Sequence, residues 1–193
     1  SGEHGLEDRF LKRLLQTTVK SLPINSTASL QAPSALRIML DDYTDAVVYR
    51  EWLHIDLIIV SESNKTVFVI ENKVGGKEGE NQLTKYREKI SQHPKFHGYQ
   101  KVYAFLTPDG DEGSDTEWGQ ITYDDILDNL SSCQKEIEAK LTIEAKLLLD
   151  HYAQLIRRNV LMEDKELLEA CREIYNRHRN AINLIMKYGA PSA

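Results

Sequence analysis

The chain has 193 residues, 41% of them hydrophobic and 28% charged, and its 24 Lys and Arg against 30 Asp and Glu leave a net charge of −6. These values are typical of a soluble globular protein with one domain, or one domain and an appendage, and they argue against a protein that coats nucleic acid over most of its surface. The aliphatic run at residues 57–60 is far too short to cross a bilayer, so we expect no membrane partner.

The two cysteines, Cys133 and Cys171, carry no metal-ligand spacing and are too few for a disulfide framework. We expect both to be buried, reduced thiols in a cytoplasmic protein. No signal peptide is visible, and the opening Ser1-Gly2 indicates a trimmed start.

The first half of the chain predicts one helix followed by a group of strands. Apolar residues at helical spacing predict a helix over residues 6–19, whereas residues 24–45 predict a loop that contains a short strand. Three extended runs follow at residues 46–52, 54–61 and 66–73, and a hairpin-like connection joins the last two.

The second half alternates helix and strand and then becomes helical. A helix is expected over residues 80–91 and a strand over 100–107, and Asp124 is a plausible N-cap after a short strand at 120–123. Two amphipathic helices complete the chain, at residues 142–160 and 164–188. The order of elements predicts a mixed α/β fold.

Charge is unevenly distributed along the chain. Residues 62–101 contain eight Lys and Arg against five acids, whereas residues 102–128 contain eight acids and no base. The basic stretch can face a polyanion such as DNA, although chance clustering on a solvated surface explains it equally well. The lysines expected to contact phosphates are Lys77, Lys85, Lys89 and Lys95.

Ionisable residues interrupt two of the hydrophobic strands. Asp56 lies inside the aliphatic run 54–60, and Glu71 and Lys73 end the run that begins at Val67. Because side chains alternate along a strand, Glu71 and Lys73 share a face. If the two strands pair as a hairpin, Asp56 and Glu71 converge near one end of the sheet.

Two carboxylates that are buried together need compensation. A divalent cation compensates both, and oxygen-only ligands favour Mg²⁺ or Mn²⁺. Such an ion beside a lysine can support hydrolysis of a phosphodiester. The alternative is a structural salt bridge at a strand end, in which Lys73 neutralises Asp56 or Glu71.

These residues resemble the PD-(D/E)XK nuclease superfamily, whose motif is D…(D/E)-x-K. Asp56 and Glu71-Asn72-Lys73 are separated by fourteen residues, and Ile55 replaces the proline of the motif. The chain is most similar to a bacterial branch in which Glu-Asn-Lys is followed by Gln-Leu-x-x-Tyr. Here that segment runs from Gln82 to Tyr86, and further likenesses lie at His4-Gly5-Leu6, Phe10-Leu11, Trp118 and Ile121-Thr122-Tyr123.

The resemblance implies specific roles for residues of the site. Asp56 and Glu71 would be ligands of Mg²⁺ or Mn²⁺, with the backbone carbonyl of Asn72 as a third. Glu7 is the best candidate for a further ligand from the first helix, although an acid at a helix N-terminus is also favoured by the helix dipole. Lys73 would position or activate the attacking water.

The helix after the motif can contribute as well. Gln82 and Tyr86 lie four residues apart on one helical face, within reach of the site or of the substrate backbone. Tyr86 can equally be a core aromatic.

The resemblance implies a restriction-endonuclease-like α/β core with a mixed central sheet flanked by helices. We expect this core at residues 1–130 and a helical extension packed on it at 131–193. The implied function is metal-dependent cleavage of DNA in bacterial defence, mobile-element or repair processes. The alternatives are a nuclease-derived nucleic-acid-binding or regulatory module that does not cleave, and a structural α/β protein with a salt-bridged strand end. A homodimer or a partner protein stays open.

Overall fold

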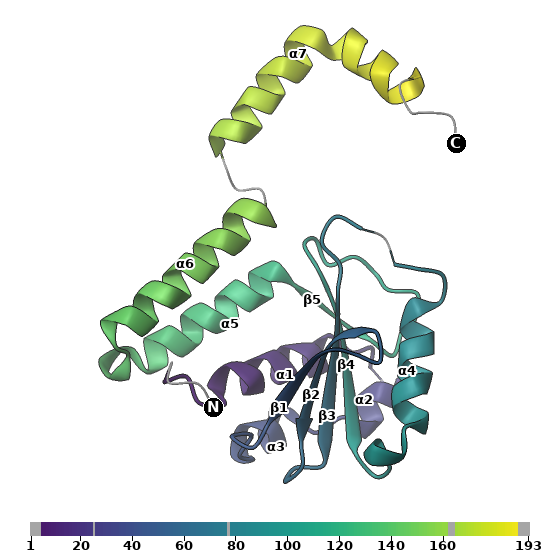
Figure 1. Cartoon of the computed structure of the whole chain (residues 1–193), viewed down its shortest axis with the longest axis vertical. Coiled ribbons are helices and arrows are strands. Elements are labelled where there is room, and N and C mark those ends of the chain that lie inside the picture. The colour runs from purple at the N-terminus through teal and green to yellow at the C-terminus, as the bar shows by residue number, and fades with distance from the viewer. Residues whose placement is uncertain (1–4, 25, 77, 162–164, 189–193) are drawn as a thin grey trace. The chain divides into compact units, whose positions relative to one another are not determined.

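The computed structural model describes residues 5–24, 26–76, 78–161 and 165–188. The chain divides into two compact units, Ser1–Tyr152 and Ala153–Ala193. The helices and strands of the chain (Figure 1) are α1 (Arg9–Ser21), α2 (Thr27–Gln31), α3 (Ala35–Leu40), β1 (Val47–Trp52), β2 (Ile55–Ser61), β3 (Thr66–Asn72), α4 (Gln82–Gln92), the 3₁₀ turn η1 (Pro94–Phe96), β4 (Gln100–Thr107), β5 (Gly119–Thr122), α5 (Tyr123–Glu136), the 3₁₀ turn η2 (Glu138–Lys140), α6 (Ile143–Asn159) and α7 (Lys165–Tyr188).

The first unit is built on one mixed sheet with the strand order β1-β2-β3-β4-β5. The pairs β1–β2 and β2–β3 are antiparallel, whereas β3–β4 and β4–β5 are parallel. The predicted pairing of the second and third strands as a hairpin is therefore confirmed. Helices flank this sheet, as Figure 1 shows for α1 and α4, and the predicted mixed α/β fold class is confirmed.

Strand β3 occupies the centre of the sheet, and this position explains its sequence. Its residues from Thr66 to Glu71 are all buried. A strand that is covered on both faces contains a continuous run of apolar side chains rather than an alternating one. Val67 and Val69 pack on the α4 side with Leu83 and Ile90, which are 0% exposed. Helix α1 packs against β4, β5 and α5.

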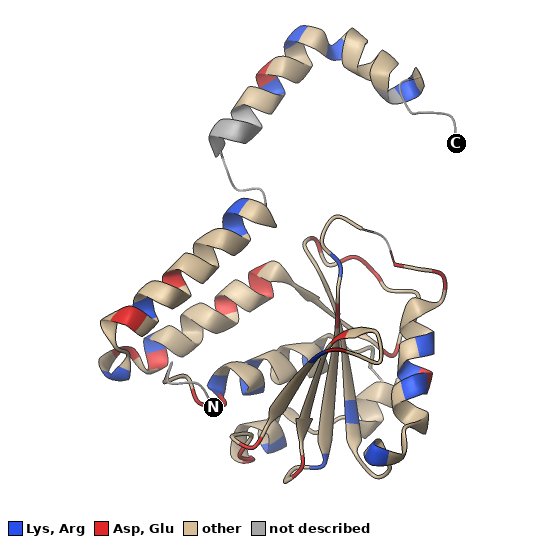
Figure 2. Ribbon diagram, viewed as in Figure 1, with Lys and Arg blue, Asp and Glu red and all other residues tan. Residues whose placement is uncertain are grey.

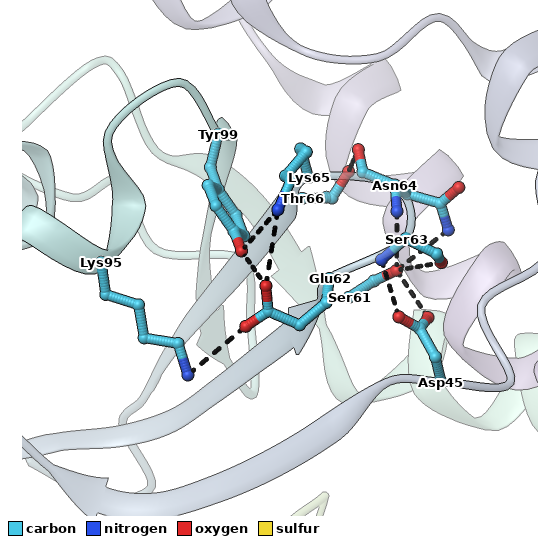
Figure 3. Close-up of polar contacts among 9 residues, drawn as sticks. All are labelled: Asp45, Ser61, Glu62, Ser63, Asn64, Lys65, Thr66, Lys95 and Tyr99. Atoms are coloured by element: carbon cyan, nitrogen blue, oxygen red, sulfur yellow. Dashed lines mark hydrogen bonds and ion pairs between the residues drawn. The ribbon is translucent and has the colours of Figure 1, made fainter.

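The connection between β2 and β3 is fixed by a polar network (Figure 3). The Asp45 carboxylate accepts from Ser61 Oγ at 2.7 Å and from the Ser63 backbone N–H at 2.8 Å. On the other side of the turn, Glu62 accepts a hydrogen bond from the Tyr99 hydroxyl and forms an ion pair with Lys95. These contacts hold the hairpin turn and thereby help to set the register of β2 on β3.

The segment at residues 24–45 differs from the prediction, because its described residues form two short helices, α2 and α3, and no strand. A serine starts each helix. Ser26 accepts from the Ser29 backbone N–H at 3.0 Å, and Ser34 accepts from the Arg37 backbone N–H at 3.2 Å. These caps satisfy backbone donors that would otherwise lack partners, so helices of five and six residues can form.

The start of α5 also differs from the prediction. Thr122, rather than Asp124, is the N-cap, and Thr122 and Asp125 form a reciprocal capping box. In this arrangement each of the two side chains accepts from the other residue's backbone N–H. Asp124 instead lies in the first turn, where its charge favours the helix dipole.

The C-terminal third is helical, as predicted, with a kink in α7 at His178. The predicted boundary at residue 130 falls inside α5, and the packing of residues 131–193 on the core stays a prediction. Cys133 is buried as expected, but Cys171 is exposed because it lies on an uncovered part of α7. Within the described residues, no helix combines the length and the apolar character needed to span a membrane.

The contact between α1 and β5 gives a prediction about stability. A Cβ atom added at Gly119 would lie 2.6 Å from the Thr18 carbonyl oxygen, and backbone cannot move aside easily. We expect Gly119→Ala to lower the free energy of unfolding by about 1–3 kcal/mol, measured by urea denaturation. Gly76→Ala is the matched control, because a Cβ there meets no atom within 4 Å. Equal unfolding midpoints for the two variants would contradict the close approach.

Candidate active site

Asp56 lies near the start of β2 and faces the end of β3. The strand register pairs Leu57 with Ile70, so the next residues, Asp56 and Glu71, lie across from each other. Asp56 Oδ2 accepts a hydrogen bond of 2.8 Å from the backbone N–H of Asn72. The two carboxylates therefore meet at one end of the sheet, where the hairpin pattern predicted them.

Glu71 is the most deeply buried carboxylate of the site, with 2% of its surface exposed. Its Oε1 accepts from Gln82 Nε2 at 2.8 Å and pairs with Lys73 Nζ at 2.9 Å. Its Oε2 is buried and has no hydrogen-bond partner among the described residues. Burial raises the pKa of Glu71, and the charge of Asp56 raises it further, against the opposing effect of Lys73.

Lys73 follows the last residue of β3, and its backbone N–H donates to the Leu106 carbonyl at 2.9 Å. Its side chain is 22% exposed and lies on the same face of the sheet as Glu71, as the alternation predicted. Burial lowers the pKa of Lys73, but its hydrogen bond to Glu71 and the charges of Glu71 and Asp56 outweigh that effect and raise the pKa above 10.5. The ammonium therefore stays charged at neutral pH.

Helix α4 brings a second polar side chain to Glu71. Gln82 is its first residue, and the side-chain amide nitrogen donates both to Glu71 and, at 2.9 Å, to the Tyr86 hydroxyl. Leu83 is 0% exposed and anchors the helix in the core. The spacing of Gln, Leu and Tyr thus gives one buried anchor and two polar groups that point to the site.

Asn72 connects the site to the other face of the sheet. Its side-chain oxygen accepts a hydrogen bond of 2.8 Å from the hydroxyl of Tyr123, the first residue of α5. No pattern in the sequence assigns Tyr123 this contact, although the segment Ile121-Thr122-Tyr123 is part of the family resemblance. The role of the Asn72 carbonyl as a metal ligand stays a prediction.

Glu7 lies outside this cluster. Its φ of 52° is not helical and α1 begins only at Arg9, so the expectation that Glu7 lies on the first helix is wrong. Its side chain is 61% exposed and pairs with Arg9. It lines an open cavity of about 540 Å³ together with Lys12 and Asp41. Within the described part of the chain, no contact joins Glu7 to Asp56 or Glu71.

The residues that are present fit a hard divalent cation. Asp56 and Glu71 offer oxygen ligands, and the buried Oε2 of Glu71 has no hydrogen-bond partner in the part of the chain that the structure describes. Mg²⁺ commonly binds through one or two carboxylates and keeps several waters. Across the described residues no cluster of three or more His, Cys, Asp or Glu is placed to hold a metal, and the candidate site offers two carboxylates.

Basic residues lie along α4 and in the turn after it, and the first residue of this helix, Gln82, contacts Glu71. Lys85 and Lys89 are exposed on the helix, and Lys95 is exposed in the turn that follows it. Figure 2 shows Lys and Arg on α4 and in the turn after it, and also on α1 and α3. Lys77 lies outside the described residues.

The sheet, the flanking helices and the Asp–Glu–Lys cluster at a strand end define a restriction-endonuclease-like α/β protein. The family model described as the PD-(D/E)XK nuclease superfamily matches residues 1–177. The chain therefore belongs to the PD-(D/E)XK nuclease superfamily. The match extends beyond Tyr123, the last residue of the likenesses found in the sequence, through α5 and α6 and into α7. No curated protein and no solved structure matches the chain.

The raised pKa of Glu71 predicts how metal binding depends on pH. A proton on Glu71 competes with a cation, and burial shifts that competition to a pH above the ordinary value of 4.5. We expect the Mn²⁺ affinity, measured by calorimetric titration, to fall as the pH decreases through this raised pKa. Mn²⁺ binding should be lost at every pH in Asp56→Ala and in Glu71→Gln.

Asp128→Asn is the control for this titration, because Asp128 is an exposed carboxylate on α5. This variant should bind Mn²⁺ like the unmodified protein. Unchanged titrations in both Asp56→Ala and Glu71→Gln would rule out the metal site.

Proposed function

We propose that this protein hydrolyses phosphodiester bonds of DNA with the help of Mg²⁺ or Mn²⁺. One observation carries the proposal above the others: among the described residues, the buried Oε2 of Glu71 has no hydrogen-bond partner, and it lies beside Asp56 and Lys73. Membership of a nuclease superfamily supports the reaction class. A setting in bacterial defence, mobile-element or repair processes rests on the family resemblance.

The two carboxylates would hold the cation. Asp56 is oriented by the Asn72 backbone N–H, which leaves its second oxygen to face a ligand. Glu71 would contribute Oε2, since its Oε1 already accepts from Gln82 and Lys73. When bound, the ion neutralises negative charge on the phosphoryl oxygens and favours a deprotonated water.

Lys73 acts as a charged donor in this proposal. Its pKa is raised, so at neutral pH it keeps its proton and does not serve as a general base. Its ammonium is placed by the contact of 2.9 Å with Glu71 and can donate to a phosphate oxygen or orient the attacking water. Such a preorganised donor stabilises the charge that develops in the transition state.

Gln82 donates a hydrogen bond to Oε1 of Glu71 and so holds that oxygen in place. Its amide shares one nitrogen between Glu71 and Tyr86, and its oxygen accepts from the Gly79 backbone N–H at 3.1 Å. These contacts hold Oε1 of the Glu71 carboxylate and leave Oε2 for the cation. Gln82 is therefore proposed as a positioning residue of the site.

A non-cleaving, nuclease-derived module is the second candidate. The net charge of −6 favours it, because strong DNA binding usually accompanies more Lys and Arg. The ion pair between Lys73 and Glu71 also suits a purely structural role. Cleavage by the purified protein separates the two functions.

Substitution of Lys73 tests the catalytic role directly. We expect Lys73→Ala to keep Mn²⁺ binding and DNA binding but to lose about 10²–10³ in single-turnover cleavage rate, since one transition-state donor is removed. Lys73→Arg should restore little, because the guanidinium is larger and differently shaped. Lys20→Ala, which removes an exposed lysine from the end of α1, should cleave at the normal rate.

Thermal unfolding of the same variants tests the structural alternative. If Lys73 serves only to neutralise the carboxylates, Lys73→Ala leaves them unpaired and loses roughly 3–5 kcal/mol of stability. A well-folded Lys73→Ala protein that cleaves at the normal rate would end the catalytic assignment.

A further inference from the structure

A row of aromatic and lysine side chains begins at the active site and runs along α4 to β1. We call it the aromatic-lysine strip and define it as Tyr86, Lys89, Trp52, Lys95 and Tyr49. Its three aromatic side chains are partly buried, with their inner sides packed on the core under α4. Both lysines are exposed.

The strip is joined to the site by direct contacts. The Tyr86 hydroxyl accepts from Gln82, whose amide also donates to Glu71. One turn further along α4, the Lys89 ammonium lies 5.8 Å from the centre of the Tyr86 ring. Lys89 also donates to the Leu53 carbonyl at 2.9 Å, which ties α4 to the tip of the β1–β2 hairpin.

Strand β1 of the β1–β2 hairpin carries the two aromatic residues at the far end of the strip, Trp52 and Tyr49. Trp52 and Tyr49 have ring centres 5.0 Å apart, and Trp52 packs edge-on against His93 and Phe96. The Lys95 ammonium lies over the rings of these two residues, 5.3 Å from the centre of the Tyr49 ring and 5.9 Å from the centre of the Trp52 ring. Beyond Lys95, the carboxylate of Glu62 ends the strip with a negative charge.

Most of the lysine–ring contacts among the described residues lie on this strip. Three of the five are made here by Lys89 and Lys95, and the other two are made by Lys65 and Lys187. A lysine ammonium has three donors, so Lys89 can keep its bond to Leu53 and still contact a phosphate. The strip thus alternates flat apolar rings with cations at the surface.

We propose that the strip binds an unpaired DNA strand that leads to or from the active site. This inference rests on the proposed function, because it names the form of substrate that the site receives. Sites for single strands combine cations that follow the backbone with aromatic rings on which bases stack. In a duplex the base faces are stacked on one another, so only an unpaired strand can place a base on Trp52 or Tyr86.

Tryptophan fluorescence tests the proposal without any need for cleavage. The chain has two tryptophans, and Trp118 is only 3% exposed. Titration of the full chain with a twelve-residue oligothymidylate, in EDTA, should quench the emission because a base stacks on Trp52. The quench should persist in Trp118→Phe and disappear in Trp52→Phe. A quench that survives in Trp52→Phe would overturn the proposal.

The lysines are tested by the salt dependence of the same titration. Lys89→Ala and Lys95→Ala should each weaken binding of the oligothymidylate several-fold and reduce the slope of log K against log salt by about 0.7, the value for one phosphate contact on a single strand. Lys20→Ala is the control and should leave both quantities unchanged. Unchanged affinity in the Lys89→Ala, Lys95→Ala double variant would place the strand elsewhere.

A blunt duplex of the same length separates this inference from the proposed function. It should give no Trp52-dependent quench, and an equal quench with duplex and single strand would overturn the preference for unpaired DNA. If the protein shows the quench but cleaves no DNA with Mn²⁺, the result supports strand binding at the strip and contradicts the proposed function. If the protein cleaves DNA without a Trp52-dependent quench, the result supports the proposed function and contradicts strand binding at the strip.

Discussion

The arrangement around the active site depends on a carboxylate, Glu71, in the central strand of the sheet, where water is excluded. Burying such a group is unfavourable unless other groups compensate it. Lys73 and Gln82 donate to Oε1 of this carboxylate, whereas Oε2 has no hydrogen-bond partner among the described residues. The pKa of Glu71 is raised for the same reason, because burial disfavours the charged form of the carboxyl group. The proposed divalent cation would offset this unfavourable burial, since both carboxylates offer oxygen ligands.

The sheet topology makes this arrangement possible. The antiparallel pairing of β2 with β3 sets Asp56 across from Glu71, while the parallel pairing of β3 with β4 leaves α4 as the crossover that starts beside the end of β3. Helix α4 therefore delivers Gln82 to the carboxylate and continues as one side of the aromatic-lysine strip. On the opposite face, Tyr123 of α5 holds the Asn72 side chain. One strand end thus gathers groups from both layers of helices.

Much of the core could be predicted from sequence because its signals are local. Alternation and apolar runs located β2, β3 and β4, and the spacing of Asp56, Glu71 and Lys73 placed these residues at one strand end. The short helices α2 and α3 were missed because each depends on a single serine cap rather than on a long apolar stripe. The prediction of Asp124 as the N-cap of α5 is wrong because Asp and Thr are both good caps, and only the backbone geometry selects Thr122.

The sequence by itself determined the fold class, the superfamily motif and the residues that share a strand face, because strand periodicity and motif spacing depend on neighbours along the chain. Only the tertiary structure decided which distant groups meet. It paired Glu71 with Gln82, connected Asn72 to Tyr123, separated Glu7 from the carboxylate pair and brought Lys95 over Tyr49 and Trp52. Such contacts join residues that lie on different elements, and their distances follow from how helices pack on the sheet, which no local pattern encodes.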